Sequence, residues 1–142
     1  MGIEPGTLAG VVLYAKDVER VATFYAAVLR LEVIERDANF VVLSQSEDGN
    51  TGTVSVVGVP PEIAEAIVLQ DPPIVREETP IKPSFLVQSL ADAVTVAHAS
   101  GGGTKTLDAA WEFRGLRHLD GFDPEGNAVQ FVERLEPQSL FT

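Results

Sequence analysis

The sequence predicts an α+β fold made of two tandem βαβββ modules. Three observations lead to this prediction. A strand pattern, a helix-capping residue, an amphipathic helix and three further strand patterns occur in the same order in both halves of the chain. The capping residues Asp17 and Ser89 are 72 positions apart, and the same offset relates Val18 to Leu90, Val21 to Ala93, Ala22 to Val94 and Phe24 to Val96. The length of 142 residues suits one domain or a pair of small repeated modules.

The first module begins with an apolar stretch rich in Val and Leu over residues 8–15, which is typical of a strand. Asp17 follows as an N-cap, because its carboxylate can accept from the exposed amides of the next helical turn. Apolar residues then recur at helical spacing from Val18 to Leu29. Three more strands are expected, separated by polar turns, over residues 31–35, 40–44 and 51–59.

Residues 60–80 interrupt this order. Pro60 and Pro61 can start a short helix over residues 62–67, since proline is well tolerated at the first helical position. The prolines that follow, from Pro72 to Pro80, predict an extended connection.

The second module repeats the order of the first. A strand is expected over residues 82–88, and Ser89 caps a helix over residues 90–100 that ends at Gly101–Gly103. The remaining strands are predicted at residues 104–109, 116–122 and 128–133, and the turn Asp123–Asn127 joins the last two. We expect a single domain, with module one at about 8–59, a connecting segment at 60–80, module two at about 81–134 and a C-terminal tail at 135–142.

Composition excludes several classes of function. With 21 acidic and 10 basic residues the net charge is −11, which repels phosphate backbones and excludes nucleic acid as a partner. The acidic surface serves either solubility or a cationic ligand. No apolar run is long enough to cross a membrane, and no secretory signal is evident. The absence of cysteine excludes disulfides, thiolate zinc sites and a cysteine nucleophile, and together these features predict a cytoplasmic protein.

Two segments, residues 11–31 and 115–133, resemble the vicinal oxygen chelate superfamily, which includes glyoxalase I, extradiol dioxygenases, fosfomycin-resistance enzymes and bleomycin-resistance proteins. The residue pairs that carry this resemblance are Asp17-Val18, Phe24-Tyr25 and Val28-Leu29, together with the Asp123–Asn127 turn. The resemblance implies that the two curved sheets form a cup around a ligand cavity, often completed across a homodimer. Arg30 departs from the family pattern, which commonly has glycine after the helix.

In enzymatic members of the family, a divalent metal is bound by residues on the first and last strand of each module. The position seven residues before Asp17 is Gly10, which has no side chain. Lys82 occupies the matching position before Ser89, and Gln130 stands seven residues after Asp123. The equivalent stretch of module one, residues 51–61, has no Asp, Glu or His. Because metals need imidazole or carboxylate ligands, we expect no metal and no cofactor.

The chain has two histidines. His98 lies near the end of the second predicted helix, where a cation interacts favourably with the helix dipole. Strand alternation places His118 and Asp120 on one face, which the family geometry turns into the cup. The two side chains can form a hydrogen-bonded pair that acts in ligand binding or proton transfer. Alternatively, they are a partly exposed pair with a structural role only. A metal site formed with Gln130 would not reproduce the family arrangement.

The same alternation places Gly10, Val12 and Tyr14 on one face of the first strand. Trp111 and Phe113 are expected on the loop before the seventh strand. Trp111 can stack on a ligand, or can anchor the core or a dimer, and Lys82 can point into the cup or reach solvent. The predicted ligand-binding residues are Tyr14, Lys82, Ser84, Trp111, Phe113, His118, Asp120 and Gln130, and His118 and Asp120 are also the candidate catalytic residues.

Two functions remain open. The first is a metal-free homodimer of the glyoxalase/bleomycin-resistance type that binds, and sequesters, a small cationic or aromatic compound. The second is a lyase, isomerase or dioxygenase with an atypical metal site or with His118 and Asp120 as acid and base. The missing metal ligands and the acidic charge favour the binding protein over the enzyme. A stoichiometric metal in the purified protein would reverse this order.

Overall fold

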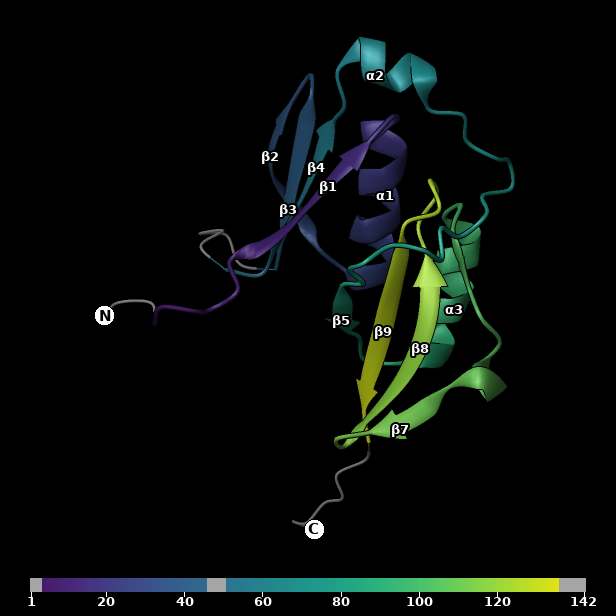
Figure 1. The fold of residues 1–142 in the computed structure, drawn as a ribbon. Coiled ribbons are helices and arrows are strands. Elements are labelled where there is room, and N and C mark those ends of the chain that lie inside the picture. Colours follow the sequence, from purple (N-terminus) through teal and green to yellow (C-terminus); the bar gives the residue numbers. More distant parts are fainter. Residues whose placement is uncertain (1–3, 46–50, 136–142) are drawn as a thin grey trace.

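The computed structural model describes residues 4–45 and 51–135 (Figure 1). The elements of this part of the chain are β1 (Gly10–Ala15), α1 (Val18–Leu29), β2 (Glu32–Asp37), β3 (Phe40–Ser44), β4 (Thr53–Gly58), α2 (Pro61–Ala66), β5 (Ser84–Leu86), α3 (Leu90–Ala99), β6 (Gly103–Thr104), the 3-10 helix η1 (Leu107–Ala109), β7 (Trp111–Phe113), β8 (Leu116–Phe122) and β9 (Ala128–Arg134). No helix among them is long and apolar enough to cross a membrane. Apart from Leu135, the predicted tail lies outside the described residues.

The strands form two mixed sheets with matching topology. The first sheet has the order β1-β4-β3-β2, and the second has the order β5-β9-β8-β6, with β7 also paired to β8. In each sheet the first strand of the module lies parallel to the last, in the registers Gly10 to Thr53 and Ser84 to Gln130. The remaining neighbours are antiparallel. This arrangement confirms the predicted α+β fold of two βαβββ modules.

The segment before β8 differs from the prediction. Residues 104–109 were expected to form one strand, but β6 ends at Thr104 and the chain then enters η1. The Thr106 hydroxyl bonds the Asp108 carboxylate and Leu107 packs against the core, so local contacts favour a tight turn over a strand. The segment that carries Trp111 and Phe113, expected as a loop, is the strand β7.

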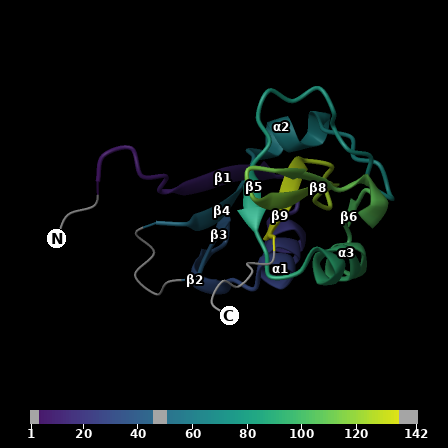
Figure 2. The same ribbon diagram turned by 90° about the horizontal axis from the view of Figure 1, so that it is seen from below.

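Helices α1 and α3 each cover one face of the sheet of their own module. Val41, Leu43, Val54 and Val56 are buried on the helix side of the first sheet, and Leu119, Val129 and Phe131 on the helix side of the second. α1 and α3 also contact each other, on the same side of β8 and β9 (Figure 2). The core therefore lies between these helices and the sheets, and within residues 4–45 and 51–135 neither α1 nor α3 covers the opposite face of its sheet.

Helix α1 begins and ends as its sequence predicts, with one strained residue. The Asp17 carboxylate accepts from the amide of Arg20, which confirms the N-cap. Arg30 closes the helix in the left-handed conformation, with φ 56° and ψ 48°, and the amide of Leu31 reaches back to the carbonyl of Ala26. A side chain in this conformation costs about 1 kcal/mol or more, which glycine would avoid.

The turn between β8 and β9 joins the two modules through buried carboxylates. Asp123 is fully buried and accepts from the Tyr25 hydroxyl at 2.8 Å and from the amides of Glu125 and Asn127. Glu125 accepts from the backbone amides of Lys16 and Asp17, immediately before α1. The start of one module is therefore fixed by the last turn of the other.

Alkaline pH is expected to destabilise the protein through Tyr25. Burial, then the charge of Asp123 and the hydrogen bond to it, raises the pKa of the Tyr25 hydroxyl well above its ordinary value of about 10. Below about pH 10 the tyrosine is protonated in both the folded and the unfolded state, and the stability of the protein does not depend on this group. Above that pH the unfolded chain releases the proton while the folded protein keeps it, so the free energy of unfolding falls. Urea unfolding measured from neutral pH to above pH 10 should show this fall, and Tyr25→Phe should remove much of it. An identical pH dependence in both proteins would contradict the assignment.

Candidate functional site

The uncovered face of the second sheet carries the polar side chains that alternation predicted. On β8, His118 and Asp120 alternate with the buried Leu119, and on β9 Gln130 lies between the buried Val129 and Phe131. The register places Asp120 opposite Gln130 on β9, and Ser84 on β5 opposite the same Gln130. Three neighbouring strands therefore bring these side chains to one surface.

His118 is held in a fixed orientation. Its Nε2 lies 3.1 Å from the carbonyl oxygen of Phe113, and its Nδ1 lies 2.9 Å from the Gln130 side-chain oxygen. Both contacts are to oxygens, and which ring nitrogen donates depends on the tautomer of the imidazole. The Ser84 hydroxyl donates to the same Gln130 oxygen at 2.9 Å. The imidazole, only 8% exposed, thus has partners on two other strands.

The short strand β7 adds aromatic rings to this surface. Trp111 stands opposite His118 in the register, and the two rings stack with their centroids 5.3 Å apart and their planes 14° apart. The Phe113 ring is 6.0 Å from the imidazole. Trp111 remains 41% exposed and Phe113 59% exposed, so both rings have surface free for a ligand.

A charged pair borders the aromatic rings. Lys82 Nζ lies 2.8 Å from a carboxylate oxygen of Asp120 and 5.9 Å from the centre of the Trp111 ring. Of the two alternatives for His118 and Asp120, the mutual hydrogen bond is not formed, because each side chain bonds to a different partner. The reason is spacing: residues two apart on a strand stand about 6–7 Å from each other, farther than direct neighbours across a strand pair.

Contacts join every predicted ligand-binding residue except Tyr14. Tyr14 lies on β1 in the other sheet, on the uncovered face, and is 64% exposed. The joined group, called the His118 cluster below, consists of Lys82, Ser84, Trp111, Phe113, His118, Asp120 and Gln130. All of these residues were predicted from the sequence, but the strand β7 was not, because three residues are too few to show a strand pattern.

The residues at the family's metal positions do not fit a divalent metal. A Cβ at Gly10 would collide with the side chain and carbonyl of Thr53, so this position has no room for a ligand. Lys82 is a cation paired with Asp120, and the Gln130 oxygen is engaged by His118 and Ser84. Within residues 4–45 and 51–135, no three His, Asp or Glu side chains come together as metal ligands.

Two cavities adjoin the His118 cluster. One of about 330 Å³ lies between Val75 and Thr79 of the connecting segment on one side and Lys82 and Asp120 on the other. Another of about 320 Å³ separates β1 from β5 and is lined by Gly10 and Ser84. Both volumes are within the range of small-molecule sites.

Solved structures with the same fold include proteins of several activities. A glyoxalase/bleomycin resistance protein/dioxygenase family enzyme from Burkholderia phytofirmans is 19% identical, with 92% of this chain and 100% of that chain covered and a TM-score of 0.64. The bleomycin resistance determinant encoded on transposon Tn5 is 14% identical, with 88% and 95% covered and a TM-score of 0.56.

A mutant of the fosfomycin resistance protein FosX from Listeria monocytogenes, in complex with Mn(II) and a dihydroxypropylphosphonic acid, is also similar. It is 14% identical, with 90% of each chain covered and a TM-score of 0.61. No protein-family model matches the chain, and no curated protein matches it in sequence. The topology and these similarities show that the chain has the vicinal oxygen chelate fold of the glyoxalase, bleomycin-resistance and fosfomycin-resistance proteins.

Proposed function

We propose that the protein is a metal-free small-molecule-binding protein of the glyoxalase/bleomycin-resistance type, which holds a small aromatic or cationic compound against Trp111. One observation carries this proposal: Trp111 is oriented by stacking on His118 and yet keeps 41% of its surface exposed. A rigid aromatic ring with free surface offers contact area at low conformational cost. Ser84, Gln130 and the Lys82–Asp120 pair add polar groups that can orient a ligand.

The charge of the ligand follows from the charge of the whole chain. Within the His118 cluster, Lys82 and Asp120 neutralise each other. The net charge of −11 therefore sets the field that an approaching ligand meets, and this field attracts cations. We infer that the His118 cluster prefers cationic and neutral aromatic compounds to anionic ones. We also propose that the protein is located in the cytoplasm and has no nucleic-acid or membrane partners.

A fluorescence titration tests this preference. Trp111 is the sole tryptophan, so its emission reports binding at the His118 cluster. Three probes share the naphthalene ring system and differ in charge, so they separate the effect of charge from that of shape. They are the cationic naphthylmethylammonium, the neutral naphthylmethanol and the anionic naphthoate. We expect the ammonium compound to change Trp111 emission at the lowest concentration, with salt weakening it most, since screening acts over about 8–10 Å at physiological ionic strength. Tightest binding of naphthoate to this site would contradict the proposal, as would a stoichiometric metal in the purified protein.

We also propose that two copies of the chain complete the ligand cavity. The uncovered faces of the two sheets expose large apolar side chains, namely Val12 (59%), Tyr14 (64%), Leu86 (52%) and Phe113 (59%). Burial of such surface stabilises association by about 25 cal/mol per Å² before the costs of ordering. β1 and β5 each end a sheet in the monomer, and an edge of this kind must be paired or covered.

The expected assembly is a two-fold homodimer at micromolar concentration. Sedimentation velocity should give the mass of two chains, and Tyr14→Glu should shift the equilibrium toward the monomer because it places a charge on the apolar face. Glu19→Gln, on the exposed surface of α1, is the control and should leave the dimer intact. A monomer in the unsubstituted protein would contradict the proposal.

The alternative, an enzyme that uses His118 and Asp120 as acid and base, has one supporting observation. His118 is a buried imidazole in a fixed orientation beside the exposed Trp111 ring. Both of its ring nitrogens and the Asp120 carboxylate are engaged with protein partners, so a substrate would have to displace one of them. The binding function needs no such displacement and is therefore the better supported of the two.

A further inference from the structure

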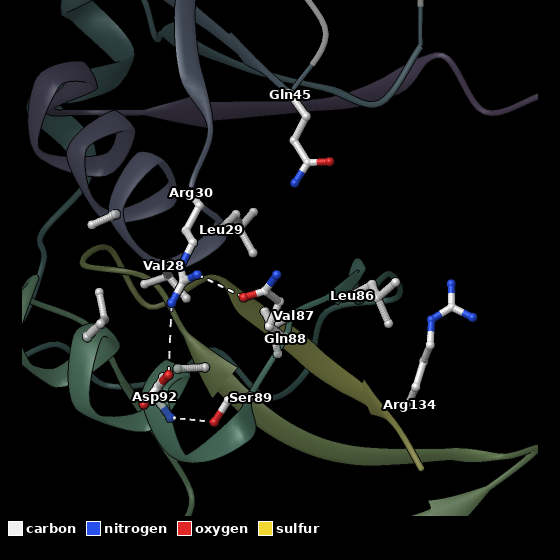
Figure 3. A pocket seen from close by; sticks show the side chains of 13 residues that line it. Val28, Leu29, Arg30, Gln45, Leu86, Val87, Gln88, Ser89, Asp92 and Arg134 are labelled. Atoms are coloured by element: carbon white, nitrogen blue, oxygen red, sulfur yellow. Dashed lines mark hydrogen bonds and ion pairs between the residues drawn. The ribbon is translucent and has the colours of Figure 1, made fainter. Parts of the chain in front are cut away.

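A third cavity lies between the end of α1 and the start of α3. Its volume is about 380 Å³ (Figure 3). Arg30 comes from the end of α1 and Arg134 from the end of β9, and Leu86 lies between them in this view (Figure 3). Neither Trp111 nor His118 lines this cavity. We refer to it as the arginine cavity.

The walls of the arginine cavity combine apolar surface with two guanidinium groups. Val28 and Leu29 of α1, Leu86 of β5 and Val96 of α3 supply the apolar part. Such a lining suits the hydrocarbon or aromatic body of a small molecule, while a few charged groups at the rim fix its orientation.

The two arginines differ in how their charges are engaged. Arg30 donates one hydrogen bond to the Gln88 side-chain oxygen at 2.9 Å, and its guanidinium lies 3.9 Å from the Asp92 carboxylate. A guanidinium has five N–H donors, so most of those on Arg30 remain available. Arg134 has no ion-pair partner among the described residues.

The charge balance of the arginine cavity is opposite to that of the chain. Arg30 and Arg134 outweigh Asp92, which leaves one positive charge in the lining of a protein whose net charge is −11. Arg30 also occupies its place at a cost, because it adopts a left-handed conformation that glycine would adopt without strain. Backbone strain of this kind is often found where a side chain has a role in binding.

We propose that the arginine cavity binds a small carboxylate-bearing molecule with an apolar body. The planar guanidinium matches a carboxylate through two parallel hydrogen bonds, and the apolar wall receives the rest of the molecule. This site is separate from the one that we propose against Trp111, so either can fail without the other.

An NMR titration of the labelled full chain with naphthoate tests the proposal. We expect naphthoate to shift the backbone amide signals of residues 86–93 and of Arg134, and naphthylmethanol, which has the same rings without the charge, to bind this place about tenfold more weakly. Signal changes confined to the neighbourhood of Trp111 would overturn the proposal, as would equal binding of the two probes.

Variants separate the role of the arginines from folding. Arg134→Gln and Arg30→Gly should each weaken naphthoate binding about tenfold, while Arg30→Gly keeps or raises the melting temperature because glycine accepts φ 56°. Arg36→Gln removes the same charge outside the cavity, from an exposed pair with Glu19, and should leave the affinity unchanged. Equal losses in all three variants would show only the effect of net charge and would overturn the proposal.

Discussion

Asp123→Ala is expected to lower the free energy of unfolding by about 3–4 kcal/mol. The carboxylate is fully buried and accepts from the Tyr25 hydroxyl, from two backbone amides and from the side-chain amide of Asn127. Its removal leaves two buried donors, the Tyr25 hydroxyl and the Glu125 amide, without an acceptor, and each such donor costs about 1–3 kcal/mol. Since the same turn holds the start of α1, the loss affects both modules.

Urea unfolding followed by far-ultraviolet circular dichroism measures this change, and the melting temperature should fall by about 10 °C. Asp108→Ala is the matched control, because Asp108 is exposed and bonds only within its own turn, and it should change the free energy of unfolding by less than about 0.5 kcal/mol. Asp123→Asn keeps the shape and some of the acceptors and should lie between the two. Equal stability of Asp123→Ala and the control would show that the turn does not join the modules.

Local patterns predicted most of the fold. Helix α1 lies where its apolar spacing and the Asp17 cap place it, and the Asp123–Asn127 turn joins β8 to β9 as the proline and glycine indicate. The contact of that turn with the first module could not be predicted. The hydrogen bond from Tyr25 to Asp123 spans 98 positions, and nothing in the turn sequence indicates which distant donor it will meet.

In the candidate site, too, the direction of each side chain could be predicted from the sequence, whereas its partners on other strands could not. Alternation along each strand placed His118, Asp120 and Gln130 on one face, because the direction of a side chain on a strand has period two. The partners of these side chains depend on the register between strands, which alternation does not give. The pairing of Lys82 with Asp120 and the stacking of Trp111 on His118 therefore appeared only in the structure.

The strand β7 was missed for a physical reason. Its three residues are too few for a periodic pattern, and a strand of this length is stable only when it pairs with a longer one. Here β8 supplies the pairing, in the register Trp111 to His118 and Phe113 to Leu116. Tertiary pairing therefore decided the conformation of a segment whose own sequence is too short to do so.

Trp111→Ala is expected to weaken naphthylmethylammonium binding about 30-fold, because a central aromatic side chain at a binding site is worth about 2 kcal/mol when truncated to alanine. Isothermal titration calorimetry is the suitable measurement, since this variant has no tryptophan to observe. Glu112→Ala is the matched control: this residue lies on the same strand but opposite Arg117, and its side chain points to the other face. The control should keep both the fold and the affinity. If the Trp111→Ala protein keeps its fold and binds the ligand as tightly as the control does, the ligand does not bind against the Trp111 ring.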